Sequence, residues 1–141
     1  MPSIDNEDSE TGYIYVLKSQ SNNPRIATTK NLFKVGFSTS SVEERIKNAE
    51  QDPTYMMAPV SIVATYRCFN MNPQRFERLI HRFFNEVCLD VEITDSNGKN
   101  YLPKEWFIAP ISVIDKAIDL IIKGEVVNYI YDNVQKKIIK K

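Results

Sequence analysis

Two short apolar segments joined by a polar connection place the strongest constraint on how this chain folds. Residues 13–17 (YIYVL) and 32–37 (LFKVGF) are rich in aromatic and β-branched side chains, a composition typical of buried strands. The polar residues 19–30 cannot bury enough apolar surface to form an element, so they are predicted to be a loop. Strands joined without a crossover helix pair most simply in the antiparallel direction. The tripeptides Tyr13-Ile14-Tyr15 and Lys34-Val35-Gly36 are therefore expected side by side in one sheet.

Two helices with a third strand between them are predicted next. Ser41 and Glu44 fit a capping box at the start of a helix that runs to about residue 50. Its apolar spacing places Arg45 on or beside the stripe that faces the core, which is an unusual place for a guanidinium. Residues 60–69 alternate apolar and polar side chains as a strand does. Asn72, followed by proline, then predicts the N-cap of a helix that runs to about residue 87.

The second predicted helix carries two kinds of polar residue on different faces. Glu77 and His81, four residues apart, share one border of its apolar stripe. Arginines on the face that points away from the core are Arg75, Arg78 and Arg82. These arginines fit either a contact with phosphates or an ordinary solvated surface.

The rest of the chain is predicted to add a hairpin and further helices. Asn97-Gly98 indicates a turn between residues 89–94 and 101–102. Residues 111–123 form an amphipathic pattern that ends at glycine, and residues 126–134 repeat apolar residues at helical spacing. The predicted fold class is α+β, with a small three-stranded mixed or antiparallel sheet flanked by helices, and with a C-terminal hairpin and helices.

Three segments are expected along the chain. Residues 1–11 are predicted to be a disordered acidic tail, residues 12–110 the main domain, and residues 111–141 a C-terminal helical extension packed on the same domain. No run approaches the roughly 18 apolar residues that span a bilayer, and the acidic start lacks the features of a signal peptide. The sequence therefore predicts an intracellular, cytoplasmic protein without membrane association.

Charge and composition exclude several kinds of chemistry. The chain has 18 basic and 18 acidic residues, and a cluster of acidic residues in the tail leaves a mild basic surplus that permits a nucleic-acid partner without indicating one. No GxSxG, GxxxxGK[ST] or HExxH pattern is present, and His81 is the single histidine. Any metal ion must then be held mainly by oxygen, which favours magnesium, and magnesium suits phosphodiester chemistry.

The order of several short motifs resembles the GIY-YIG nucleases. The resemblance spans about residues 12–107. It rests on Gly12-Tyr13-Ile14-Tyr15-Val16-Leu17, Lys34-Val35-Gly36, Arg45 and Glu77. It is closest to the branch of small phage and bacterial proteins in which a glutamate and a histidine share a helix and a Glu-Trp-Phe triplet follows, matched here by Glu77, His81 and Glu105-Trp106-Phe107.

The resemblance implies a metal-dependent endonuclease that hydrolyses DNA, with four catalytic residues. Tyr15 would help to deprotonate or orient the attacking water, and Arg45 would bind the charge of the transition state. Glu77 would be the protein ligand of Mg²⁺ or Mn²⁺. Lys34 stands where the family usually has tyrosine, and it would bind the scissile phosphate or lower the pKa of Tyr15. His81, with Arg78 and Arg82, is expected to contact the substrate.

A structural alternative stays open for each of these residues. Tyr15 fits an ordinary sheet aromatic, and Lys34 fits an exposed strand lysine. Arg45 could pair with Glu44 or Glu50 on the surface, and Glu77 could interact only with His81. The alternative function is a catalytically inactive nucleic-acid-binding or protein-interaction module on the same scaffold. Gly36 is expected to leave room for a helix or for substrate, and Trp106 and Phe107 are expected to anchor the core.

Overall fold

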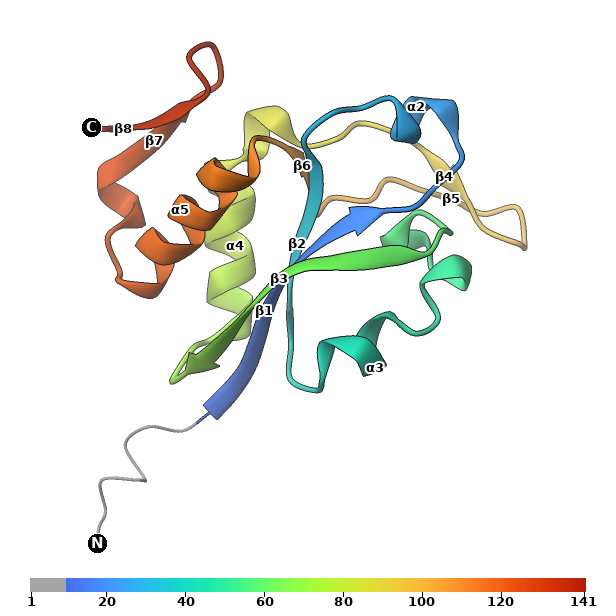
Figure 1. The fold of residues 1–141 in the computed structure, drawn as a ribbon, viewed down its shortest axis with the longest axis horizontal. Helices are drawn as coiled ribbons and strands as arrows, with labels where there is room; N and C mark the ends of the chain where they lie inside the picture. The colour runs from blue at the N-terminus through green and yellow to red at the C-terminus, as the bar shows by residue number, and fades with distance from the viewer. Residues whose placement is uncertain (1–9) are drawn as a thin grey trace, which may run out of the picture.

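A four-stranded antiparallel sheet organises the computed structural model, which describes residues 10–141. The strands are β1 (Glu10–Ser19), β2 (Leu32–Ser38), β3 (Val60–Phe69) and β6 (Trp106–Ile108), in the order β3-β1-β2-β6 (Figure 1). The α+β class is confirmed, and every neighbouring pair is antiparallel. The fourth strand was not predicted, because three residues are too few to show an alternating pattern.

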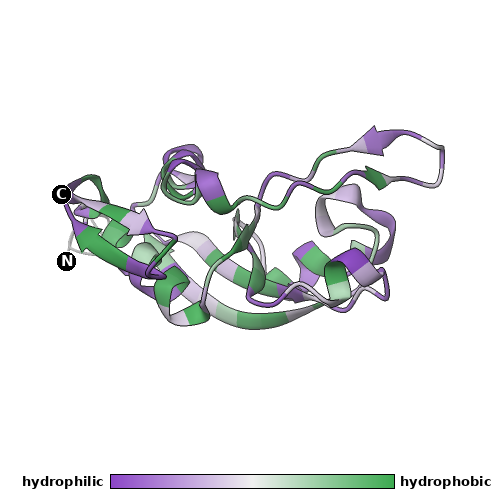
Figure 2. Ribbon diagram, turned by 90° about the horizontal axis from the view of Figure 1, so that it is seen from above, coloured by the Kyte–Doolittle hydropathy of each residue, from purple (hydrophilic) through white to green (hydrophobic). Residues whose placement is uncertain are grey.

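The predicted pairing of the first two strands is confirmed. Tyr15 lies opposite Gly36, and Leu17 lies opposite Lys34. Since side chains alternate across a sheet, these four residues share one face of it. The intervening residues Ile14, Val16, Val35 and Phe37 enter the main core on the other face. Figure 2 shows this alternation of apolar and polar residues along the strands.

Helices cover both faces of the sheet. The long helices α4 (Pro73–Phe83) and α5 (Ile111–Ile122) pack over the face of the main core (Figure 1). The short helix α3 (Val42–Ile46) and the 3₁₀ turns η1 (Ala49–Gln51) and η2 (Pro53–Tyr55) lie over the other face. The sheet thus lies between Tyr15 and Lys34, on the side of α3, and helix α4 on the other side.

The predicted helix starts are confirmed, but both helices end earlier than expected. Ser41 Oγ accepts a hydrogen bond from the Glu44 amide at 3.2 Å, and Asn72 caps α4 through the Arg75 amide at 3.0 Å. The helix α3 ends at Ile46, and a turn, η3 (Asn85–Val87), follows α4 after Phe83. Boundaries depend on tertiary contacts, which the helical spacing of a sequence does not contain.

Smaller elements complete the fold. A short helix, α2 (Pro24–Ala27), lies within the predicted loop between β1 and β2. The predicted hairpin is confirmed as β4 (Ile93–Thr94) and β5 (Asn100–Tyr101), with Gly98 in the left-handed region at φ 83°. The 3₁₀ turn η4 (Val126–Asn128) leads into the last part of the chain.

The prediction of a helix over residues 126–134 is wrong. The structure has a hairpin there, made of β7 (Tyr129–Asp132) and β8 (Lys137–Lys140). The clustered apolar residues fit helical and strand periods alike, and packing of Tyr131 and Ile138 against the main core selects the hairpin. The α5 part of the predicted 111–141 extension is helical and contributes Ile114 and Ile118 to the same core.

The predicted disordered tail, residues 1–11, lies mostly outside the described residues. Its last two members, Glu10 and Thr11, are an exception, because they begin strand β1. Within residues 10–141, no helix is long and apolar enough to cross a membrane.

Candidate active site

A buried lysine lies at the centre of the candidate site. Lys34 is completely buried, so the alternative of an exposed strand lysine is wrong. Its Nζ donates to Glu105 Oε1 at 3.0 Å and to the Tyr15 hydroxyl at 3.4 Å. The same Nζ lies 5.3 Å from the ring centroid of Tyr15 and 5.2 Å from that of Tyr55. One carboxylate and two electron-rich rings therefore surround this ammonium group.

Two tyrosines meet on the sheet face that holds Lys34. The Tyr15 hydroxyl lies 3.4 Å from the hydroxyl of Tyr55, which comes from turn η2, and both side chains are 1% exposed. Both belong to the cluster that packs between this face of the sheet and α3. Tyr55 was not among the predicted site residues, because nothing in its sequence neighbourhood marks it.

The expectation that Lys34 lowers the pKa of Tyr15 is wrong. Burial raises the pKa of Tyr15, and the hydrogen bonds with Tyr55 and Arg45 oppose this rise without reversing it. Burial likewise raises the pKa of Tyr55. Both phenols therefore hold their protons at neutral pH, so Tyr15 can orient a water molecule but is a poor proton acceptor.

Gly36 makes room for the Tyr15 ring and not, as expected, for a helix or substrate. A Cβ atom at Gly36 would lie 2.5 Å from both Cζ and the hydroxyl oxygen of Tyr15, far inside van der Waals contact. The glycine of the second tripeptide thus allows the tyrosine of the first to lie flat across the neighbouring strand.

We expect Gly36→Ala to displace the Tyr15 phenol. Overpacking of this kind costs about 1–3 kcal/mol of folding stability. Because a shift of about 1 Å in a catalytic group can reduce a rate about a hundredfold, DNA cleavage should fall by that factor. The control is Gly98→Ala, where an added Cβ meets nothing within 4 Å although φ is 83°. Cleavage assays and urea unfolding of both variants test this, and an unchanged cleavage rate in Gly36→Ala would contradict it.

Arg45 reaches the site from helix α3. Arg45 is exposed, so the prediction that it lies on or beside the core-facing stripe of the helix is wrong. Its guanidinium nevertheless lies beside the Tyr15 hydroxyl. The hydrogen bond with Tyr15 raises the pKa of Arg45. Glu44 pairs with Lys47 at 2.6 Å, so the alternative in which Glu44 holds Arg45 is not observed.

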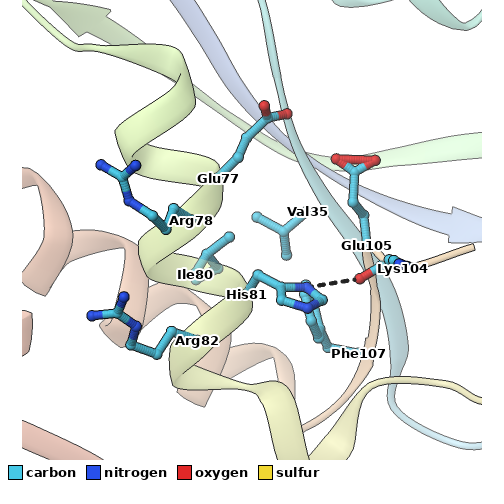
Figure 3. Close-up of a pocket in the computed structure, with 9 residues that line it drawn as sticks. All are labelled: Val35, Glu77, Arg78, Ile80, His81, Arg82, Lys104, Glu105 and Phe107. Atoms are coloured by element: carbon cyan, nitrogen blue, oxygen red, sulfur yellow. Dashed lines mark hydrogen bonds between the residues drawn. The ribbon is translucent and has the colours of Figure 1, made fainter.

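Glu77 reaches the site around an edge of the sheet. Helix α4 packs on the face opposite Tyr15, but β6 pairs with β2 only from Leu32 to Lys34, and one more bond, from the Val35 amide to the Glu105 carbonyl oxygen at 3.1 Å, ends the coverage of this edge. Beyond that point the carboxylates of Glu77 and Glu105 face each other across the same hollow (Figure 3). Burial, and then the negative charge of Glu105, raise the pKa of Glu77, while Lys34 and Arg45 lower it.

The hollow between α4 and the segment before β6 also contains the predicted substrate-binding residues. It encloses about 420 Å³, and Glu77, Glu105, His81, Arg78 and Arg82 line it. The His81 ring points into it, whereas the two arginine side chains extend from the outer side of α4 (Figure 3).

His81 is fixed by the backbone. Its Nδ1 lies 3.1 Å from the carbonyl oxygen of Lys104, and its ring packs edge-on against Phe107 at 6.0 Å. Since a carbonyl only accepts, Nδ1 carries the proton and Nε2 is left as an acceptor in the neutral ring. The structure gives no hydrogen bond between His81 and Glu77 among the described residues.

A hard divalent cation fits the two carboxylates only as a partly hydrated ion. Glu77 and Glu105 supply oxygen ligands from separate elements, and the charge of Glu105 raises the pKa of Glu77, a repulsion that a divalent cation between them would relieve. Within residues 10–141, no group of three or more His, Cys, Asp or Glu side chains is placed so that it could hold a metal ion together. This donor set suits magnesium, which keeps several waters, and does not suit zinc.

Sequence reasoning brought Tyr15, Lys34, Arg45 and Glu77 to attention, and the structure brings all four together around Glu105. Glu105 was noticed only as part of a Glu-Trp-Phe triplet. The prediction that the other two members anchor the core is confirmed, since Trp106 and Phe107 are fully buried and the Trp106 indole donates to the Thr54 carbonyl at 2.9 Å.

Comparison with known proteins gives one family match. A sequence model of the T5orf172 domain matches residues 12–122 of this chain. A curated protein of Bacillus subtilis (strain 168), described as "Uncharacterized protein YeeC", is 48% identical over 122 residues, which cover 86% of this chain and 32% of that protein. The chain thus spans about a third of the length of this relative. No solved structure matches the chain.

Proposed function

Because this chain belongs to the T5orf172 domain family, which is related to the GIY-YIG domains, we propose that it is a metal-dependent endonuclease that hydrolyses DNA phosphodiester bonds. The observation that carries the proposal is the meeting of Tyr15, Lys34, Arg45 and Glu77, from four separate elements, at one edge of the sheet. The Glu77 and His81 spacing and the triplet that begins at Glu105 support a place in the branch of small phage and bacterial proteins. We place the nuclease core in residues 12–110 and treat residues 111–141 as an extension packed on it.

The buried polar groups would each act on one part of the reaction. In hydrolysis, a water oxygen forms a bond to phosphorus, one ester bond to phosphorus breaks, and the leaving oxygen gains a proton. Tyr15, protonated and held between Tyr55 and Lys34, would orient the water by hydrogen bonding. Arg45 would bind the negative charge that builds up on the phosphoryl oxygens, since its charge is permanent and its guanidinium lies beside Tyr15.

Glu77 is the residue that would hold Mg²⁺ or Mn²⁺, with Glu105 beside it. A bound divalent ion supplies Lewis-acid polarisation of a phosphoryl oxygen. Lys34 would keep Glu105 in place and would offset part of the negative charge of the two carboxylates. Arg78, Arg82 and His81, which line the same hollow, would contact the phosphates of the bound strand.

The experiment that tests the proposal is cleavage of supercoiled plasmid DNA by the purified chain with Mg²⁺, with Mn²⁺ and with a chelator. We expect cleavage only with a divalent ion, and a fall of about a hundredfold in Arg45→Ala, the usual effect of removing one fixed electrostatic group. The matched control is Lys47→Ala, two residues further along at the end of α3, exposed and paired with Glu44.

A catalytically inactive binding module is the second candidate. It is favoured by one observation, that Lys34 stands in the position where the family usually has tyrosine, next to a phenol whose pKa burial raises. Under this candidate, the wild-type chain cuts no DNA with either ion but retards DNA in a gel in a salt-sensitive way. That result would overturn the nuclease proposal.

A further inference from the structure

A second hollow lies directly beside the candidate active site. It encloses about 710 Å³ between the end of α4, the turn η3 and the C-terminal hairpin β7–β8. Arg82 lines both this hollow and the one that contains Glu77. A strand bound at the active site can therefore continue past Arg82 into the second hollow without leaving the protein surface.

Apolar and aromatic side chains line the interior of this second hollow. Three aliphatic residues there are unusually exposed, Val127 at 59%, Ile130 at 45% and Val134 at 92%. The rings of Phe83, Tyr129 and Tyr131 line it as well. The Tyr131 hydroxyl is buried and has no hydrogen-bond partner within residues 10–141, although buried phenols usually find one. The hollow thus offers apolar surface and aromatic rings, whereas the Tyr131 hydroxyl, being buried, is not presented to a ligand.

Unpaired positive charges border the hollow. Arg82 and Lys141 line it, and neither forms an ion pair with any described carboxylate, unlike Lys47, Arg67 and Lys123 on other surfaces. Two carboxylates line the hollow as well, so its formal charges balance, and one of them, Asp132, accepts hydrogen bonds from the Val134 and Gln135 amides at 2.9 and 3.1 Å. Glu86 is the other acidic residue that lines the hollow. The rim nearest the active site, at Arg82, is cationic.

We propose that the second hollow binds unpaired bases of a single-stranded flank of the nucleic acid that is cut at the neighbouring site. This proposal rests on the proposed nuclease function and assigns its substrate class, a nucleic acid with a single-stranded segment next to the scissile bond. Unpaired bases bind proteins by placing their faces on aromatic and apolar side chains, while cations hold the phosphates. Paired bases are stacked inside a duplex and cannot enter such a hollow without being separated.

The continuity of the two hollows favours this occupant over a protein partner. An acidic peptide would also pair with Arg82, and a second copy of the chain would also cover apolar surface, but neither explains why the hollow adjoins the proposed cleavage site through Arg82. These occupants predict different results in the experiment below.

The binding test uses fluorescence anisotropy with a labelled 12-nucleotide single strand and a blunt hairpin duplex, without divalent ions. We expect the single strand to bind more tightly than the duplex. Ile130→Glu and Lys141→Glu should each weaken single-strand binding about tenfold, because one stacked base contributes roughly that factor. Their matched controls are Ile122→Glu and Lys116→Glu, exposed positions on α5 that do not line the hollow. Circular dichroism checks that all four variants are folded.

Cleavage separates this proposal from the nuclease proposal. A substrate with a single-stranded flank should be cut less efficiently by Ile130→Glu, whereas a short duplex without the flank should be cut at the wild-type rate. If the single strand binds equally to all four variants and to wild type, or if sedimentation shows that Ile130→Glu abolishes a dimer, the hollow has another occupant and the proposal is overturned. If the wild-type chain cuts nothing but the binding differences hold, the nuclease proposal fails and the assigned binding site stands.

Discussion

Glu77→Gln is expected to reduce cleavage at least about a thousandfold while it stabilises the folded protein. Loss of the carboxylate that we propose as the ligand of the divalent ion should remove several kcal/mol of transition-state stabilisation, and each 1.4 kcal/mol corresponds to a factor of ten. A matched control is Glu92→Gln, an exposed carboxylate that lines neither hollow. Plasmid cleavage under saturating Mg²⁺ measures the first effect, and wild-type turnover in Glu77→Gln would rule out the assigned role.

The gain in stability follows from the raised pKa of Glu77. Burial, and next the charge of Glu105, raise this pKa above its ordinary value of 4.5, so the folded protein holds the proton more tightly than the unfolded chain does. The contribution of Glu77 to stability is therefore fully present below about pH 4.5 and is lost as the pH rises through the raised folded pKa. Glutamine does not titrate, so the stability difference between variant and wild type should grow with pH.

Urea unfolding of wild type and Glu77→Gln at pH 5 and pH 8, without divalent ions, measures this difference. We expect Glu77→Gln to unfold at a higher urea concentration than wild type at pH 8. A variant that is less stable than wild type at pH 8 would show that Glu77 supports the fold by contacts that outweigh its repulsion from Glu105.

Glu105→Ala is expected to destabilise the fold by about 3 kcal/mol, although Glu105 is the more exposed partner of its ion pair. The side chain of Lys34 is 1% exposed and that of Glu105 is 35% exposed. Removal of the carboxylate leaves an ammonium group buried without its counter-charge. Removal of the ammonium leaves a carboxylate that water still reaches. Lys34→Met should therefore cost much less than Glu105→Ala, and Glu105→Gln should fall between them because its amide oxygen can still accept from Nζ.

A double-mutant cycle tests this asymmetry. In Lys34→Met/Glu105→Ala the buried charge is gone, so much of the stability lost in Glu105→Ala should return. Chemical unfolding of the four proteins gives the coupling free energy. Equal losses in the two single variants would mean that the cation–π contacts of Lys34, at 5.2 and 5.3 Å, are enough to hold it without Glu105.

Some parts of the candidate site could be predicted from the sequence, and others could not. Tyr15 and Gly36 could be placed opposite each other because a short polar connection leaves antiparallel pairing as the simple solution, and the pairing is confirmed. Glu77 could be placed on a helix border because its spacing from apolar neighbours is local. In contrast, Glu105 lies 71 residues from Lys34 along the chain, so only the tertiary fold reveals their ion pair.

Burial, which the sequence does not show, decides how Lys34 and Tyr55 take part in the site. Lys34 has the same local pattern as an exposed strand lysine, but the neighbouring strand and turn η2 bury it completely. Tyr55 follows a proline-containing loop with no periodic pattern, and its hydroxyl still meets that of Tyr15. The raised pKa of Tyr15, which changes its expected part in the reaction, is a result of that burial and so could not be predicted from residue types.

The sequence by itself determined the α+β class, the strand pair and the helix caps, because each depends on interactions between residues close together in the chain. Only the tertiary structure decided three other features. They are the C-terminal hairpin, the fourth strand, and the approach of side chains from both faces of the sheet at one edge. The physical reason is that the bonds from the β6 segment to β2 end at Val35, so the β2 edge beyond Val35 stays open. Through that opening Glu77, from the opposite face, reaches the cluster of Tyr15, Lys34 and Glu105.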